Sequence, residues 1–180
     1  GLIKGGASKP AGIEGAGESV ALGAGVTGLQ VGQRVMGRCP AAFSEYAVMD
    51  AREAMTVPAG LPMEVAAAVP LTFLVVHDML VLQGRLKAVE WLLVAGVSSG
   101  VGVASLQAAK ALGARVIGTS GSPDKLARLQ ALGLDVAIAT RAPDFATQVM
   151  EATGGHGVYL VVNTVGGSVF AECMRTLAFE

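Results

Sequence analysis

A glycine-rich turn is the segment of this sequence best suited to bind a ligand. Residues 96–102, Gly-Val-Ser-Ser-Gly-Val-Gly, follow an apolar run and precede a helical pattern. At such a turn, backbone N–H groups and the positive end of the helix dipole can receive a pyrophosphate, which glycines allow to approach closely. The spacing departs from G-x-G-x-x-G, because a serine stands where the middle glycine would align. We predict a dinucleotide site formed by Ser98, Ser99, Gly100, Val101 and Gly102; the alternative is that the glycines serve only close packing.

The end of the next apolar run indicates which dinucleotide is bound. Residues 118–122, Gly-Thr-Ser-Gly-Ser, contain no carboxylate, and the first one that follows is Asp124. A carboxylate here would bind the 2′-hydroxyl of NAD, whereas hydroxyl and basic groups accept the 2′-phosphate of NADP. We predict that Ser120, Gly121 and Lys125 bind this phosphate, so that NADPH is preferred to NADH. For Lys125 the alternative is an ordinary solvated lysine on a helix surface.

The pattern around these residues predicts an α/β fold with a doubly wound parallel sheet. Apolar runs separated by helical patterns are typical of a parallel sheet with helices on both faces. Ser122 and Pro123 form a favoured start for the second helix. The expected strands span residues 90–95, 115–119, 136–138 and 159–162, and the expected helices span residues 103–112, 124–132, 145–153 and 169–179.

The earlier part of the chain has a different character. Residues 1–60 are punctuated by glycines and carry strand-like runs at 31–36 and 44–49, which indicates a small β domain with tight turns. Residues 64–69 and 71–82 are then expected to form two helical pieces, separated by Pro70.

Composition and charge exclude several classes of function. Thirteen basic and fourteen acidic residues leave a net charge of −1, so no general field attracts nucleic acid or acidic lipid. Only two cysteines occur, and no secretory segment precedes them, from which we expect a reducing, cytoplasmic location. The longest apolar run, residues 65–76, is shorter than the roughly 20 residues of a membrane-spanning helix, so we expect no membrane association.

Taken alone, the G-x-x-x-G-x-G spacing of the turn resembles the short-chain dehydrogenase/reductase family. That family needs a tyrosine with a lysine four positions further on, because the ammonium lowers the pKa of the phenol. Here Tyr46 is followed at that distance by Asp50, and Tyr159 by Asn163. The sequence therefore excludes that family.

Short motifs of one kind of protein recur along nearly the whole sequence. They are Gly-Ile-Glu-Gly-Ala-Gly at 12–17 and residues 31–35, 43–46, 66–72, 99–102, 107–110 and 163–167. Together they resemble the medium-chain dehydrogenase/reductase superfamily, in its quinone oxidoreductase (zeta-crystallin-like) branch. The resemblance implies a partial GroES-like catalytic domain with a linking helix over residues 1–76, and a partial Rossmann domain, incomplete at its C-terminal end, over residues 77–180. It implies a chain truncated at both ends, whose full-length form is a homodimer.

The activity that this resemblance implies is hydride transfer from NADPH to a small-molecule quinone or related conjugated carbonyl, as in a quinone or enoyl reductase, without zinc. Ile13 occupies the position of a zinc-binding histidine, and an aliphatic side chain cannot coordinate the metal. Cys39, His77 and His156 have no partners at ligand spacing. Glu14 resembles the family's retained glutamate, with a structural or a catalytic role. No catalytic residue is assigned.

The resemblance also implies further cofactor contacts. Thr72, Asn163 and Val165 are expected along the nicotinamide side, although for Thr72 an ordinary buried hydroxyl is the alternative. Thr140 stands where quinone reductases often have a tyrosine near the adenine-side phosphate, and Asn163 where relatives often have aspartate. A second hypothesis is a non-catalytic fragment or component that binds a nucleotide without turnover.

Overall fold

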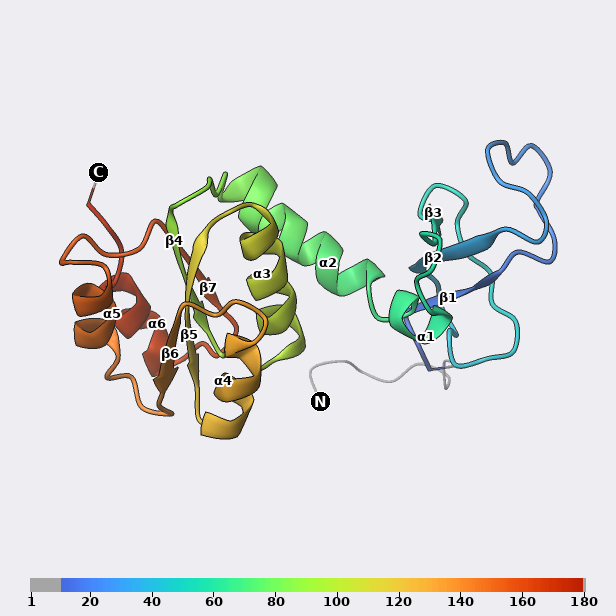
Figure 1. Ribbon diagram of the computed structural model, residues 1–180. Helices are drawn as coiled ribbons and strands as arrows, with labels where there is room; N and C mark the ends of the chain where they lie inside the picture. The colour runs from blue at the N-terminus through green and yellow to red at the C-terminus, as the bar shows by residue number, and fades with distance from the viewer. Residues whose placement is uncertain (1–10, 180) are drawn as a thin grey trace. The chain divides into compact units, whose positions relative to one another are not determined.

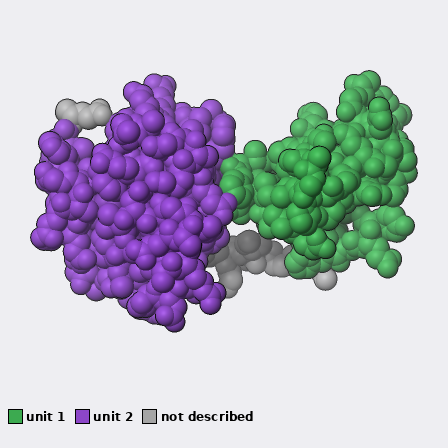
Figure 2. All heavy atoms as spheres, viewed as in Figure 1, with its two compact units in different colours: residues 1–74 green, residues 75–180 purple. Residues whose placement is uncertain are grey.

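The computed structural model describes residues 11–179, and the chain divides into two compact units, residues 1–74 and 75–180 (Figure 2). The first ten residues of the predicted β domain, and Glu180, lie outside the described residues. That the units act as a catalytic and a dinucleotide-binding domain, with a boundary after residue 76, stays a prediction.

Unit 1 is built on a small antiparallel sheet, in the order β1-β2-β3. Strand β1 (Glu14–Glu18) pairs along its whole length with β2 (Arg34–Arg38), and β3 (Met55–Thr56) adds two residues on the other side of β2. Buried Met36, Val57 and Ala66 form its core. The strand expected at 31–36 begins only at Arg34, because Gly32 turns the chain with a φ of 83°.

The strand predicted at residues 44–49 is wrong. This segment forms no regular element, and it exposes Tyr46 and Val48 to solvent, as does Phe43 just before it. An alternating sequence becomes a strand only where another strand satisfies its backbone hydrogen bonds. No strand of the described residues pairs with this segment, so the alternation has no ladder to join.

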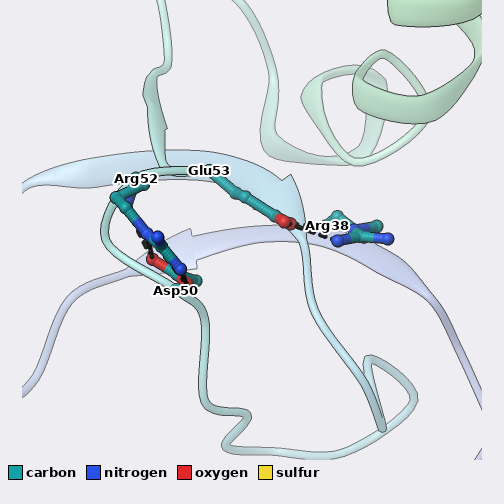
Figure 3. A network of polar contacts seen from close by, with 4 residues as sticks. All are labelled: Arg38, Asp50, Arg52 and Glu53. Atoms are coloured by element: carbon teal, nitrogen blue, oxygen red, sulfur yellow. Dashed lines mark hydrogen bonds and ion pairs between the residues drawn. The ribbon is translucent and has the colours of Figure 1, made fainter.

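A turn at residues 50–53 is held against β2 by one ion pair, and a second ion pair lies within the turn (Figure 3). The Arg38 guanidinium donates to both carboxylate oxygens of Glu53, at 2.8 and 2.5 Å, and Arg52 does the same with Asp50. Arg52 holds the pKa of the Asp50 carboxyl down at about 2, and Arg38 likewise lowers the pKa of Glu53. Gly37 permits this approach, since a β-carbon there would lie 2.5 Å from the Glu53 carbonyl oxygen.

This network makes part of the acid stability of unit 1 depend on Asp50. Its pKa is depressed, so its contribution is complete above the ordinary value of 3.8 and is lost as the pH falls toward about 2. We expect Asp50→Asn to lower the urea midpoint slightly at pH 5, because the pair is exposed, and to leave it unchanged near pH 2. Equal effects at both pH values would contradict this. Glu151→Gln, which removes an exposed carboxylate in unit 2, is the control.

The two helical pieces predicted around Pro70 are confirmed. Helix α1 (Met63–Ala66) is short, and α2 (Pro70–His77) begins at the proline, whose missing N–H costs nothing at a first helical position. Helix α2 continues as η1 (Asp78–Gln83), a segment of π-helix. The Leu71 N–H donates to the Glu14 carboxylate at 2.8 Å, so Glu14 caps α2 and has a structural role. None of the helices in the described part of the chain is long and apolar enough to cross a bilayer.

Unit 2 is a parallel sheet with helices on both faces, and the predicted fold class is confirmed (Figure 1). Its strand order is β6-β5-β4-β7. Helices α3 and α4 cover one face, and α5 and α6 cover the other. The strands are β4 (Trp91–Ala95), β5 (Arg115–Ser120), β6 (Val136–Ala139) and β7 (Leu160–Asn163). The helices are α3 (Gly100–Ala111), α4 (Pro123–Gln130), α5 (Ala146–Ala152) and α6 (Ser168–Met174).

The last helix ends earlier than the sequence pattern predicts. Helix α6 stops at Met174 instead of continuing to residue 179, because Leu177 forms a parallel bridge with Val158 beside β7. The buried Glu172 carboxylate on α6 accepts the Ala146 N–H at 2.7 Å and pairs with Arg175 at 2.8 Å. Helix α5 has no side-chain cap of its own, so Glu172 of the neighbouring helix α6 caps it instead.

Helix α3 contains a buried hydroxyl that makes no hydrogen bond within the described part of the chain. Ser105 is fully buried, and its Oγ has no partner there. An unsatisfied buried hydroxyl costs about 1–3 kcal/mol, whereas alanine leaves almost the same packing. We expect Ser105→Ala to raise the free energy of unfolding by about 1 kcal/mol in urea titrations. Ser168→Ala, at an exposed position, should change it little; a lower stability for Ser105→Ala would contradict the argument.

Candidate dinucleotide site

The carboxyl ends of the parallel strands bring the predicted site together at one edge of the sheet. From β4 the chain crosses by α3 to β5, and it reaches β7 by way of α5 on the opposite face. Strand β4 therefore lies between neighbours whose connections run over different faces. Ligands of open α/β sheets bind in the crevice at such a switch point.

The glycine turn after β4 brings α3 directly over the end of the strand. Gly96 has a φ of 80°, and Ser99 caps the helix by accepting the Gly102 N–H at 3.1 Å. A β-carbon on Gly102 would lie 2.5 Å from the Gly96 carbonyl oxygen and 2.6 Å from that of Val97, so only glycine fits. At Gly100, by contrast, a β-carbon would meet no atom within 4 Å. The turn is therefore tightly packed at Gly102 and open at Gly100.

Two backbone donors lie in the first turn of α3, beside this space. Within the described residues, the amides of Gly100 and Val101 donate to no acceptor, while Gly102 N–H is bound to Ser99 and Val103 N–H to the Ser99 carbonyl. Unpaired amides in the first turn of a helix, together with its dipole, form a site for an anion. These amides and the space at Gly100 fit a bound phosphate group.

The end of β5 supplies hydroxyl groups beside the turn. Ser120 is buried, and its Oγ lies 2.8 Å from the Oγ of Ser98. The same Oγ also accepts the Ser122 N–H at 3.3 Å. Ser122 in turn caps α4 by accepting the Lys125 N–H at 3.4 Å, which confirms the predicted cap and places Lys125 in the exposed first turn of that helix.

Sequence reasoning missed one basic residue in this region. A β-carbon on Gly121 would overlap the Arg141 side chain, so the guanidinium arm lies directly against this glycine. Within residues 11–179, no carboxylate lies at ion-pair distance from Arg141. Its signal was present in the sequence, because Arg141 closely follows β6, the strand next to β5, and adjacent parallel strands end at the same edge.

The turn after β7 lies against the glycine turn. Asn163 Oδ1 accepts the N–H groups of Val165 and Gly166, at 2.9 and 3.0 Å, and so shapes this turn. The Thr164 hydroxyl donates to the Ala95 carbonyl at 3.0 Å and lies 3.4 Å from Ser99 Oγ. The Asn163 side chain thus stabilises the backbone of its own turn, and Val165 in that turn is exposed to solvent.

Two predicted residues are placed differently. The Thr140 hydroxyl donates to Asp144 Oδ1 at 2.8 Å and accepts the Ala142 N–H at 3.0 Å, so it is engaged within its own loop. Thr72 lies in the first turn of α2, in the segment that belongs to unit 1. The roles of both toward a cofactor stay predictions.

Metal ligands and reactive thiols do not gather in the described part of the chain. Among residues 11–179, no three His, Cys, Asp or Glu side chains come close enough to hold a metal ion. Burial raises the pKa of the Cys39 thiol, and burial together with Glu172 raises that of Cys173. A hollow of about 1220 Å³ does occur in unit 1, between β1 and residues 39–54, with mostly small apolar side chains around it.

Residues 100–180 match the family of zinc-binding dehydrogenases. A phthioceranic/hydroxyphthioceranic acid synthase of Mycobacterium tuberculosis is 34% identical over 170 residues, which cover 94% of this chain and 8% of that protein. An erythronolide synthase of Saccharopolyspora erythraea is 37% identical over 169 residues, which cover 93% of this chain and 5% of that protein. The chain therefore spans less than a tenth of the length of these relatives.

Solved structures reproduce the fold over nearly the whole chain. The CurK enoyl reductase has a TM-score of 0.85 at 30% identity, over 94% of this chain and 51% of its own. A quinone oxidoreductase of Pseudomonas syringae pv. tomato DC3000 has a TM-score of 0.83 at 34% identity, over 93% and 52%. A mycobacterial protein solved in complex with NADPH has a TM-score of 0.85 at 33% identity, over 93% and 53%.

The parallel sheet with its glycine turn is the fold of a dinucleotide-binding oxidoreductase. The chain spans about half the length of these similar structures. The predicted resemblance to the medium-chain dehydrogenase/reductase superfamily is confirmed at the level of the superfamily, and the similar structures include both quinone oxidoreductase and enoyl reductase.

The contrast between two glycines of the turn can be tested directly. We expect Gly102→Ala to lower the free energy of unfolding by about 2 kcal/mol, because its β-carbon would meet backbone carbonyls that cannot move aside. Gly100→Ala, whose β-carbon enters open space, should keep the stability of the parent chain. Urea titration followed by circular dichroism gives both values. Similar losses in the two variants would contradict the described packing.

Proposed function

We propose that this chain provides the NADPH site of an oxidoreductase that reduces conjugated carbonyl compounds without zinc. The observation that carries the proposal is the pair of amides, Gly100 and Val101, which have no acceptor within residues 11–179 and lie at the switch point of the sheet, where a β-carbon on Gly100 would enter open space. The residues at the ends of β5 and β6 are the ones proposed to distinguish NADPH from NADH. Membership of the dehydrogenase superfamily, and the NADPH bound by a similar mycobacterial protein, support the same cofactor.

The amides of Gly100 and Val101 would hold the pyrophosphate. They point along the axis of α3, so each hydrogen bond is reinforced by the helix dipole. The Gly102 contact keeps the helix close to β4, which brings the phosphate near the sheet edge. Ser99 Oγ accepts the Gly102 N–H and caps the helix, which holds these two amides in place.

The 2′-phosphate would lie at the end of β5. Ser120 and Ser98 offer hydroxyl groups there, and Arg141 beside Gly121 offers a guanidinium that no described carboxylate neutralises. A guanidinium binds phosphate through parallel N–H bonds, which makes it more selective than a lysine point charge. Lys125, in the first turn of α4, would add a second positive charge.

The reduced nicotinamide, when bound, supplies a hydride to an electron-poor carbon of the acceptor. The chain's own contribution is orientation and exclusion of water, for which Thr72, Asn163 and Val165 are the proposed residues. Ile13, in place of a zinc-binding histidine, and the dispersed His, Cys, Asp and Glu side chains of residues 11–179 support a mechanism without zinc. Quinones and enoyl thioesters share a conjugated carbonyl, and similar structures include reductases of both names.

The proposal is tested by titrating the purified chain with NADPH and NADH while following nicotinamide fluorescence. We expect NADPH to bind more tightly. Arg141→Gln should weaken NADPH binding about tenfold and leave NADH unchanged, because only the former has the 2′-phosphate. Gly100→Asp should abolish binding of both, because its carboxylate would occupy the phosphate space. The matched control is Arg128→Gln, which removes an exposed arginine of α4 that has no proposed contact with the cofactor.

Turnover is then measured as NADPH oxidation with 1,4-benzoquinone, with a short enoyl thioester and with a saturated aldehyde. We expect oxidation with at least one conjugated acceptor and none with the aldehyde. Tight NADPH binding without turnover of any acceptor would contradict the oxidoreductase part of the proposal and would favour a nucleotide-binding module. Absence of NADPH binding would contradict the whole proposal.

A further inference from the structure

A chain of hydrogen bonds crosses the glycine turn from α3 to the end of β4. The Gly102 N–H donates to Ser99 Oγ at 3.1 Å, and Ser99 Oγ lies 3.4 Å from Thr164 Oγ1. Thr164 Oγ1 then lies 3.0 Å from the Ala95 carbonyl oxygen. The four groups come from β4, the turn, α3 and the segment after β7, and they join the three elements that meet at the switch point.

The direction of each bond follows from the number of protons available. A carbonyl oxygen only accepts, so the single Thr164 hydroxyl proton is committed to Ala95. In the long contact between the two hydroxyls, Ser99 must therefore be the donor. The Ser99 proton then points toward Thr164, and one of its lone pairs is taken by Gly102.

Packing holds Thr164 in this position. The Thr164 N–H also faces the Ala95 carbonyl, at 3.3 Å. A β-carbon on Gly96, whose φ is 80°, would lie 2.8 Å from Thr164 Oγ1 and 3.1 Å from Val165. The hydroxyl thus fits against the bare backbone of the first glycine of the turn.

From this arrangement we propose that Thr164 is a positioning residue of the dinucleotide site. Its hydroxyl orients Ser99 as the cap of α3, so that the Ser99 proton turns away from the phosphate space and the Gly100 and Val101 amides become the donors to phosphate. This inference rests on the proposed function for its ligand, but the orientation of Ser99 is a property of the chain alone. The role differs from general stabilisation, because it predicts coupling between Thr164 and Ser99.

Four variants test the proposal: Thr164→Val, which keeps the shape and removes the hydroxyl, Thr164→Ser, which keeps the hydroxyl, Ser99→Ala, and the double variant Ser99→Ala/Thr164→Val. Thr147→Val, at an exposed position of α5, is the matched control. NADPH dissociation constants are measured by nicotinamide fluorescence. Exchange of the Gly102 amide hydrogen is measured by NMR without any nucleotide.

We expect Thr164→Val to weaken NADPH binding about fivefold and to speed Gly102 exchange by a similar factor, the effect of one lost hydrogen bond. Thr164→Ser and Thr147→Val should stay close to the parent chain. In the Ser99→Ala background, Thr164→Val should have little further effect on either measurement, because the group that it orients is gone.

Additive effects of Ser99→Ala and Thr164→Val, or unchanged Gly102 exchange in Thr164→Val, would overturn the proposal. Failure of the parent chain to bind NADPH would contradict the proposed function instead. In that case the exchange measurement decides about Thr164 by itself: accelerated exchange in Thr164→Val, restored in Thr164→Ser, supports the positioning role, and equal rates overturn it.

Discussion

The close approach of α3 to the end of β4 is the constraint on which the rest of unit 2 depends. It is possible because Gly102 has no side chain, since a β-carbon there would overlap the carbonyl groups of Gly96 and Val97. The neighbouring strand β5 also needs a glycine, since a β-carbon on Gly118 would lie only 2.6 Å from the Val97 side chain. With both glycines in place, Val97 is buried between strand and helix, and the first turn of α3 opens over the edge of the sheet.

The electrostatics of that edge are local. The chain as a whole is almost neutral, and in unit 1 the cations Arg38 and Arg52 are matched by Glu53 and Asp50. At the sheet edge the donors are backbone amides, hydroxyls and the guanidinium of Arg141. An anion is thus attracted by oriented donors at short range, which suits a bound cofactor better than a long polyanion, whose binding depends on a broad positive surface.

Hydroxyl groups at this edge serve mainly to hold the backbone in place. Ser99 and Ser122 cap helices, Thr164 fastens the end of β7 to β4, and Thr140 is engaged within its loop. Ser99 and Ser122 do so as acceptors, whereas Thr164 and Thr140 donate their single protons, which are then not available to a ligand. Glu14 and Glu172 also hold the backbone, because each carboxylate accepts an N–H at the start of a helix from a different element. The site is therefore shaped by polar side chains and is open for binding mostly through main-chain groups.

The sequence alone determined the parallel sheet, the glycine turn, the break between two helical pieces at Pro70 and the helix cap at Ser122, because periodicity and capping act over a few residues and leave local patterns. Its short motifs, compared with known proteins, gave the resemblance to the superfamily. Only the tertiary structure decided the rest. Residues 44–49 alternate like a strand but have no described partner, and α6 stops at Met174 because Leu177 pairs with Val158. The contacts of Arg141 with Gly121 and of Thr164 with Gly96 join residues 20 and 68 positions apart in the sequence. The position of Arg141 after β6 indicates the edge of the sheet at which it lies, but the contacts themselves arise only when the folded strands end at that common edge.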